Sequence, residues 1–577
     1  MKGSEKKLAS YMQGADKRFI IPVYQRNYDW KQDNCKQLYD DLVKIIKKDR
    51  KSHFFGSVVS VHTDGEDNEF LIIDGQQRVT TISILLLAMY NLMMEKVMVP
   101  EKSNLPDKIK KTYLIDEFEE DESCIKLKPI KKDRKAFQKL FGERDEYILD
   151  SNITINYQYF YSRIQKEEIT IDQLYTAIMR LEIIDIKLSQ DDNPQLIFES
   201  LNSTGLALNE GDKIRNFILM GLPTKEQNLF YEKYWNRIEK HAGNNLTYFI
   251  RDYLSVKQQA IPSISKVYTT FKYYVEDRNI NTENLLQDML KYAKRYEILL
   301  KGTIKNAHAL KACIERLNRL ETTVIRPFLL EILRIYDEKN ITLQEMQEIF
   351  LLTENYVFRR SICDIPTNGL NKIFLFLHRE IVRLDGSMDN YFEKFKYVLL
   401  AKSERQRFPK DNEFIEAFSR KNIYNMNNKN KIYILERFEN ANTLEDKDVY
   451  RHCDEGIYSV EHIMPQNLNS TWVSDLGEEV KEIHEKWLHR LANLTLTAYN
   501  SKYSNKSFKE KIEMENGFIQ SGLRLNTWIA KQNKWGCEEL EQRNTMLMEQ
   551  AVKIWAYPIS LYEAKSQYMD VWSYVKI

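Results

Sequence analysis

Residues 71–90 constrain the fold more than any other stretch: an apolar run breaks at 74–78 (DGQQR) and then resumes as apolar sequence. Residues 54–62 and 70–73 have the β-branched and aromatic content of two strands, and the polar turn between them predicts a hairpin. The apolar residues after the break are long and dense enough for a buried helix, and two threonines in its first turn are expected to cap it. The DGQQR string is therefore expected between a strand and a helix N-terminus.

This position favours an anion. The helix dipole and its unpaired N–H groups attract negative charge, Gly75 allows close approach, and the Arg78 guanidinium can fork onto phosphate oxygens. The Asp74 carboxylate beside them can hold a hydrated divalent cation or orient a water. The alternative is an ordinary strand-to-helix turn with a solvated arginine.

A second candidate segment lies upstream, in the proline-interrupted residues 19–30. Tyr24, Gln25 and Arg26, followed by Tyr28 and Trp30, place aromatic faces, an amide and a guanidinium within seven residues. Such a mixture suits a nucleotide. Core aromatics with one surface arginine would produce the same string.

Composition limits the class of protein. A chain of 577 residues suggests three or four folded units, and 85 Lys+Arg against 84 Asp+Glu give a net charge of +1, so any DNA contact must come from a local patch. Six scattered cysteines without a Cys-x-x-Cys pair favour reduced thiols. The first residues lack the apolar core of a signal peptide, and the longest apolar run is too short for a bilayer. We expect no membrane partner and a cytoplasmic location.

The periodicity predicts an α+β protein that is predominantly helical, with domains at 1–220, 221–404 and 405–577. Residues 181–188 are expected to form a strand, and 195–201 a helix followed by a glycine turn.

In the helical middle part, Arg359 and Arg360 are expected to be solvated at a helix end. Further on, residues 449–452 are expected to be extended and 431–438 helical.

A second constellation follows a strand-like run at 458–466, where Glu461 and His462 stand side by side. A strand that ends in histidine, a second strand that contains Asn493 and a helix that begins with asparagine are the parts of a ββα nuclease finger. Histidine can deprotonate water near neutral pH, and an adjacent carboxylate with a helix asparagine can hold one hydrated metal ion. The Asn493 amide can fix the loop or the histidine tautomer.

The surroundings of this constellation are basic. Residues 481–511 contain seven Lys and Arg against three Glu: Lys481, Lys486, Arg490, Lys502, Lys506, Lys509 and Lys511, with Glu482, Glu485 and Glu510. Such a local excess suits a phosphate backbone. His484 and His489 are five residues apart, which is poor spacing for one helical face, so they are expected to be structural or solvated rather than zinc ligands. A surface histidine with unrelated asparagines is the alternative.

Several of these strings together resemble a known family. Residues 21–30, 74–81 and 198–216 resemble the N-terminal domain of GmrSD-type restriction proteins. Residues 461–466 (EHIMPQ) and 493–496 (NLTL) look like their C-terminal HNH domain, in the fused single-chain arrangement. The chain departs from the family at Ala492, where glycine is frequent.

The resemblance implies a ParB/sulfiredoxin-like N-terminal fold that binds and hydrolyses nucleoside triphosphates. It also implies a C-terminal HNH (ββα-metal, His-Me finger) nuclease that cuts double-stranded, modified DNA in a type IV system. A related branch, the SspE-like proteins, senses phosphorothioate DNA. The residue assignments that follow from the resemblance are a nucleotide site of Tyr24, Gln25, Arg26, Asp74, Gly75, Gln76, Gln77 and Arg78; catalytic roles for Asp74, Arg78, Glu461, His462 (general base) and Asn493; and Glu461 with Asn500 or Asn505 as ligands of Mg²⁺ or Mn²⁺.

The leading hypothesis is therefore an NTP-regulated, metal-dependent endonuclease that restricts modified or foreign DNA, with the nucleotide biasing a conformational or oligomeric equilibrium. Two alternatives come from other classes: a nucleotide-dependent DNA-binding switch with a degenerate finger, and an adaptor that senses modification and recruits a separate nuclease. The sequence leaves the oligomeric state open, a homodimer included.

Overall fold

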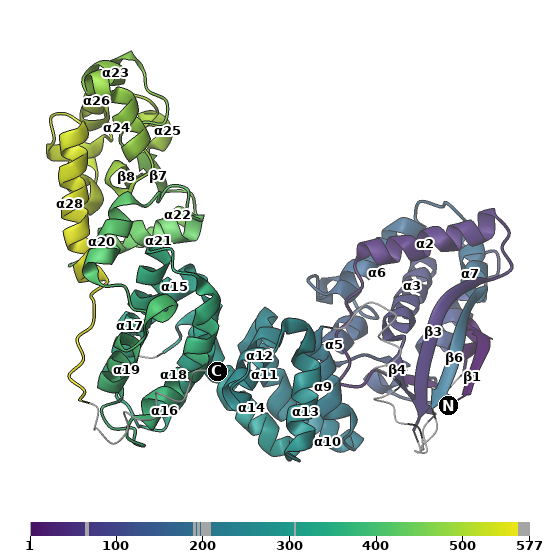
Figure 1. Ribbon diagram of the computed structural model, residues 1–577. Coiled ribbons are helices and arrows are strands. Elements are labelled where there is room, and N and C mark those ends of the chain that lie inside the picture. The colour runs from purple at the N-terminus through teal and green to yellow at the C-terminus, as the bar shows by residue number, and fades with distance from the viewer. Residues whose placement is uncertain are drawn as a thin grey trace. The chain divides into compact units, whose positions relative to one another are not determined.

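The computed structural model describes residues 2–14, 16–63, 68–188, 209–304 and 307–563, together with Asp192 and Ile197. The class is predominantly helical α+β, as predicted (Figure 1). The chain divides into two compact units, Met1–Glu239 with Ile264–Gln287 and Lys240–Ser263 with Asp288–Ile577. The three-domain division expected from the sequence stays a prediction.

The first unit is built on a six-stranded mixed sheet with the strand order β1-β6-β3-β4-β2-β5. Its strands are β1 (Lys2–Lys7), β2 (Arg18–Ile20), β3 (His53–His62), β4 (Glu69–Asp74), β5 (Leu127–Lys128) and β6 (Leu181–Leu188). Its helices are α1 (Leu8–Met12), α2 (Gln32–Lys47), α3 (Gln76–Met94), α4 (Leu105–Ile109), α5 (Lys131–Lys139), α6 (Asn152–Ile164), α7 (Ile171–Met179), α9 (Glu210–Met220), α10 (Thr224–Phe230) and α13 (Val267–Asp277). Helices α11 (Asn236–Ala242) and α14 (Thr282–Lys301) run from one unit into the other.

The predicted hairpin is confirmed, since β3 pairs antiparallel with β4, and β4 ends at Asp74. The strand expected at 181–188 is confirmed as β6, which pairs parallel with β3. The expected threonine cap is wrong: α3 begins at Gln76 after an N-cap at Gly75, so Thr80 and Thr81 lie inside the helix. Most of the DGQQR string is thus the first helical turn.

One continuous hydrophobic core joins the sheet to its helices. Leu42 of α2, Leu85 of α3, Phe160 of α6 and Ile183 of β6 are all part of it, and each is fully buried. Figure 1 shows α2, α3, α6 and α7 gathered beside β3 and β6. This packing holds the start of α3 at the C-terminal end of β4.

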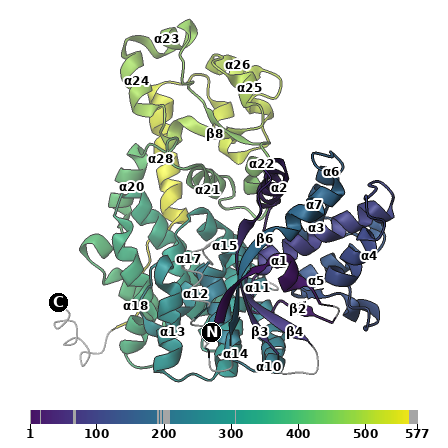
Figure 2. The same ribbon diagram turned by 90° about the vertical axis from the view of Figure 1, so that its right-hand side faces the viewer.

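The second unit is helical apart from one small sheet of β7 (Ser459–His462) and β8 (Leu494–Thr497). Its helices are α12 (Leu246–Gln258), α15 (His308–Arg319), α16 (Arg326–Asp337), α17 (Leu343–Ile362), α18 (Leu370–Arg383), α19 (Tyr391–Leu400), α20 (Asp411–Arg420), α21 (Asn428–Glu439), α22 (Val449–Asp454), α23 (Ser470–Leu476), α24 (Val480–Trp487), α25 (Asn500–Tyr503), α26 (Phe508–Glu513), α27 (Arg524–Thr527) and α28 (Cys537–Ile554). Figure 2 shows α28 beside α20 and α21, with which it packs.

Two local expectations in this unit are wrong. Residues 449–452 are helical rather than extended, because Asp448 caps α22 by accepting a hydrogen bond from the Arg451 N–H. Arg359 and Arg360 are buried rather than solvated. Arg359 donates to the carbonyls of Trp555 and Pro409, at 2.6 and 3.0 Å, and so ties α17 to the segment after α28.

Further expectations concern the cysteines, the membrane and the segment around residues 195–201. All six cysteines are unpaired, as predicted. No helix in the described part of the chain is long and apolar enough to cross a bilayer. The helix expected at 195–201 and the glycine turn after it lie outside the described residues, and the next described helix is α9.

Candidate functional site

The strand-to-helix turn at Gly75 is shaped by glycine. Its φ of 90° is left-handed, and a Cβ there would lie 2.9 Å from the Ser57 carbonyl oxygen, so both conformation and space require glycine. The chain can therefore turn from β4 directly into α3. This brings the Asp74 carboxylate and the first turn of a 19-residue helix together.

Hydrogen bonds of glutamine amides join the upstream segment to the DGQQR string, as predicted. Gln77 Oε1 accepts from the Asp29 and Trp30 N–H groups, at 2.9 and 3.1 Å. Gln76 Nε2 donates to the Arg26 carbonyl at 3.1 Å, and Gln25 Nε2 to the Ile73 carbonyl at 2.7 Å. All three amides hold main chain, so their role in this structure is to fix the loop.

Tyr24 is also part of the scaffold. Its side chain is only 3% exposed, so its ring presents no open face for stacking. Its carbonyl accepts from Arg215 Nε at 2.8 Å, and Arg215 is in turn paired with Asp212 and Glu239. The sequence analysis did not single out Arg215, although this residue lies in the 198–216 string that carries the family resemblance.

Three charged side chains at this turn remain partly exposed: Arg26, Asp74 and Arg78. Burial raises the pKa of Asp74, while Arg78 and Arg26 act against that shift. Arg78 Nη1 donates to the Ser57 carbonyl at 3.2 Å, and its guanidinium lies so close to Gly56 that a Cβ there would be 2.6 Å from Nε. Two guanidiniums beside a helix N-terminus can attract a phosphate group.

The second constellation begins at the end of β7. His462 is the last residue of that strand and lies opposite Leu494 of β8. Neighbouring strand residues point to opposite faces. Accordingly, Glu461 pairs with Lys511 at 2.6 Å, and Lys511 Nζ also donates to the carbonyls of His462 and Ile463, at 2.9 and 3.2 Å. Lys511 is fully buried, so counting it among the surface charges was wrong.

The prediction that Asn493 lies on the second strand is wrong, since β8 begins at Leu494 and Asn493 ends the short helical turn before it. From there Asn493 fixes the loop after His462, which is one of its two predicted roles. Its Oδ1 accepts from the Met464 N–H at 2.8 Å, and its Nδ2 donates to the Met464 and Leu488 carbonyls, at 2.9 and 3.1 Å. The asparagine is fully buried. It therefore locks the chain around His462 without contacting the ring.

The His462 ring lies among other rings. Tyr424 is 4.2 Å away between centroids, and His489 Nδ1 lies 3.3 Å from His462 Nε2. Burial, with further contributions from His489 and nearby lysines, lowers the pKa of His462 to about 3. The imidazole is therefore neutral at pH 7, so one of its two ring nitrogens carries no hydrogen. His489, which was expected to be structural or solvated, lies directly beside the His462 ring.

Cations gather around these rings. Lys431 Nζ donates to the Tyr424 carbonyl at 2.8 Å and lies 4.4 Å from the Tyr424 ring centroid. Burial, with a smaller contribution from the charge of Arg420, lowers the pKa of Arg490, whose guanidinium lies 5.1 Å from the Trp487 ring centroid. Like charges that converge beside a neutral histidine favour an anionic ligand.

Metal ligands at this site are few. Among the described residues, no group of three or more His, Cys, Asp or Glu is arranged to hold a metal ion. Glu461 faces Lys511, Asn500 Nδ2 donates to Ser459 Oγ and the Val460 carbonyl, and Asn505 is exposed. The free oxygen donor is Asn500 Oδ1. Mg²⁺ is usually held through one or two carboxylates, and the carboxylate of this set, Glu461, is paired with Lys511, so a metal ion at this site stays a prediction.

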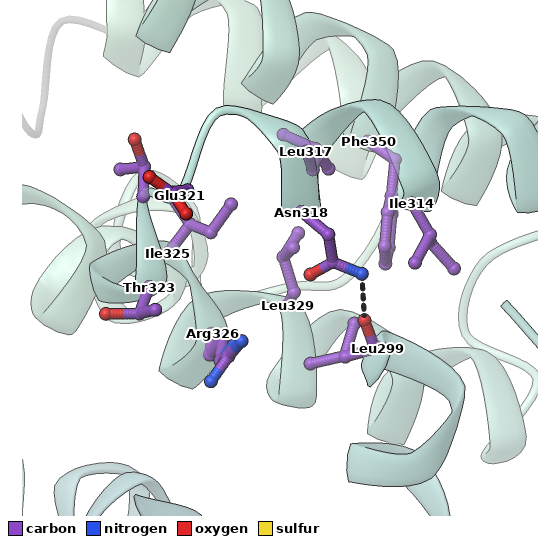
Figure 3. A pocket seen from close by; sticks show the side chains of 11 residues that line it. Leu299, Ile314, Leu317, Asn318, Glu321, Thr323, Ile325, Arg326, Leu329 and Phe350 are labelled. Carbon is purple, nitrogen blue, oxygen red and sulfur yellow. Dashed lines mark hydrogen bonds between the residues drawn. The ribbon is translucent and has the colours of Figure 1, made fainter. Parts of the chain in front are cut away.

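A small, partly open pocket elsewhere in the second unit is too small to be a further candidate site. It lies between α15, α16 and α17, has a volume of about 30 Å³, and is lined mostly by apolar residues such as Leu317, Leu329 and Phe350 (Figure 3). Asn318 donates across its rim to the Leu299 carbonyl at 3.0 Å. A space of this size holds about one water.

Comparison with known protein families gives two matches, one for each of the regions described above. Residues 8–219 match the GmrSD restriction endonuclease N-terminal domain, and residues 408–550 match the GmrSD restriction endonuclease C-terminal domain. No curated protein matches the chain. The first match contains the DGQQR turn and the second contains the His462 cluster, in the order in which the family carries them. The chain therefore belongs to the GmrSD restriction endonucleases, with both domains on one polypeptide.

Proposed function

We propose that this protein is an NTP-regulated, divalent-metal-dependent endonuclease that cuts modified or foreign double-stranded DNA at an HNH-type site around His462. One observation carries the proposal: a neutral, buried histidine at a strand end, with its loop locked by Asn493 and with Lys431 close by. Membership of a restriction endonuclease family supplies the reaction class.

In the proposed reaction, His462 takes a proton from a water molecule. The water oxygen then forms a bond to phosphorus, the P–O ester bond opposite breaks, and the leaving oxygen takes a proton from solvent. Lys431 and Arg490 hold the phosphate oxygens against the ring. A Mg²⁺ or Mn²⁺ ion held by Asn500, with Glu461 as a further ligand if Lys511 releases it, would stabilise negative charge on the phosphate.

The nucleotide site is proposed at the DGQQR turn in a ParB/sulfiredoxin-like domain. Arg26, Arg78 and the α3 N-terminus would bind the phosphates, and Asp74 would hold the accompanying cation or orient the hydrolytic water. Gln25, Gln76 and Gln77 would act by holding the loop that carries Arg26. Nucleotide binding would bias the equilibrium that exposes the nuclease site.

The test incubates the purified chain with modified and unmodified plasmid DNA, with Mg²⁺ or Mn²⁺, and with or without NTP. Wild type should cut modified DNA, and His462→Ala should lose at least about 100-fold in cleavage rate. His308→Ala, an exposed histidine at the start of α15, is the matched control and should cut normally.

The nucleotide site is tested with Arg78→Ala against Arg50→Ala, an exposed arginine of the same unit. Arg78→Ala should lose NTP hydrolysis while its thermal unfolding stays unchanged, and Arg50→Ala should retain hydrolysis. Cleavage by His462→Ala at the wild-type rate would refute the nuclease site. Unchanged hydrolysis in Arg78→Ala would refute the nucleotide site.

A further inference from the structure

His489 is built into the site around His462. It follows α24, and its carbonyl accepts from the N–H groups of Ile423 and Tyr424, at 2.9 and 3.2 Å. The Tyr424 ring stacks on the His489 ring, with an interplanar angle of 10° and a centroid distance of 5.3 Å. Held by its backbone and its ring face, His489 has a defined orientation.

That orientation aims one imidazole at the other. His489 Nδ1 lies 3.3 Å from His462 Nε2, across 27 residues of sequence. The second nitrogen of His462 has its own neighbour, since Gln466 Nε2 lies 3.4 Å from Nδ1 and also donates to the Tyr424 hydroxyl at 3.3 Å. Both ring nitrogens of His462 are therefore matched to a specific partner.

These contacts determine a tautomer. An amide nitrogen only donates, so Nδ1 of His462 accepts from Gln466, and the ring hydrogen must then reside on Nε2. The Nε2–H group of His462 then donates to Nδ1 of His489. The ring hydrogen of His489 therefore lies on its own Nε2. The acceptor that orients a general base is often a carboxylate. Here the adjacent carboxylate, Glu461, is held by Lys511 instead.

We propose that His489 is a positioning residue for the cleavage reaction: it accepts the Nε2–H of His462 and thereby leaves Nδ1 as the atom that takes the proton from water. The inference rests on the proposed nuclease function and deepens it. Gln466 then occupies Nδ1 until the attacking water replaces its amide.

The experiment compares His489→Leu, His489→Asn and His489→Gln in the full-length protein. Asparagine places an amide near the position of the imidazole Nδ1, glutamine reaches further, and leucine removes the acceptor. Two quantities are measured: the single-turnover rate of cutting modified plasmid DNA with Mg²⁺, and the ¹⁵N shifts of the His462 ring in protein labelled at its nine histidines, assigned with His462→Ala.

His489→Leu should cut about 10–100-fold more slowly, the usual effect of losing an orienting partner, and the His462 signals should move from the Nε2–H form to a tautomer mixture. His489→Asn should restore most of the rate and the single tautomer. His308→Leu should change neither quantity.

If His489→Leu cuts at the wild-type rate with an unchanged His462 tautomer, the inference is wrong even though His462→Ala is inactive. If His462→Ala itself cuts normally, the proposed function fails instead. If His489→Leu does not fold, the test compares the cutting rates of His489→Asn and His489→Gln, provided that the two variants have equal thermal stability. Faster cutting by the asparagine variant supports the inference, and equal rates refute it.

Discussion

The turn at Gly75 and the strand end at His462 use the same kinds of residue in different ways. At Gly75 the amides hold main chain while Asp74, Arg26 and Arg78 stay partly exposed. At His462 the charged pair, Glu461 with Lys511, is buried as scaffold, and the group left for chemistry is a neutral imidazole. A motif string thus contains both framework and reactive residues, and the residue type does not tell which is which.

The largest effect is expected from breaking the buried ion pair with Lys511→Met. This change leaves Glu461 buried without its partner and should destabilise the second unit by about 3 kcal/mol. Thermal unfolding measures it, and Lys511→Met with Glu461→Leu should recover part of the loss. If Glu461 is a metal ligand, Mg²⁺ should stabilise Lys511→Met more than wild type. An equal Mg²⁺ effect on both would remove Glu461 from the proposed ligand set.

The corresponding test at the first site is Gln77→Leu. Two main-chain N–H groups, of Asp29 and Trp30, would lose their acceptor, which should cost about 2 kcal/mol. Hydrogen exchange of the peptide covering residues 24–31 should become faster, and NTP affinity should fall with it. Unchanged exchange in this peptide would show that the amide clamp does not hold the loop.

The pH dependence of stability should have opposite signs at the two sites. The pKa of His462 is about 3 in the folded protein and about 6.5 when unfolded, so between these values the unfolded chain binds more protons and stability falls as pH falls. Neutral His462→Gln should therefore be less sensitive to acid, by about 2 kcal/mol at pH 5 and by more at pH 4. The sign reverses at Asp74, because its raised pKa means that stability falls as pH rises through the window between the unfolded and folded values.

Unfolding monitored separately in each unit, by hydrogen exchange at pH 4 and pH 7, checks both signs. The control for the first unit is Asp74→Asn. Equal acid sensitivity of wild type and His462→Gln would contradict the low pKa assigned to the imidazole.

The smallest effect is expected from the cations beside His462. Lys431→Ala and Arg490→Ala should each weaken DNA binding about 5–10-fold and reduce the slope of log affinity against log salt by about 1. Lys339→Ala, an exposed lysine after α16 and outside the basic segment 481–511, is the comparison. The same salt slope in all three variants would place the DNA phosphates elsewhere.

Local pattern predicted much of the framework. The 54–62/70–73 hairpin, the 181–188 strand and the 431–438 helix follow from periodicity and residue type, whereas the approach of Gln25 to the DGQQR string was implied by the family resemblance. The helix start was placed four residues late, because a left-handed glycine can open a helix without a side-chain cap.

Contacts between distant segments could not be predicted in this way. His489 was judged by its spacing from His484 on one helix, yet α24 ends at Trp487 and the relevant neighbour is His462. Arg359 contacts carbonyls up to 196 residues away, so no window of sequence reveals that it is buried. The burial of Lys511 depends on β7 in the same way.

Helix α3 is buried along nearly its whole length, from Gln76 to Met89, and has no continuous polar stripe. Hydrophobicity alone therefore does not decide how such a helix is rotated about its axis, since every face is apolar. The amides of Gln76 and Gln77 make only one rotation compatible with their main-chain partners. These two glutamines therefore fix the rotation of α3 about its axis, so a short polar turn also determines how the core around the helix packs.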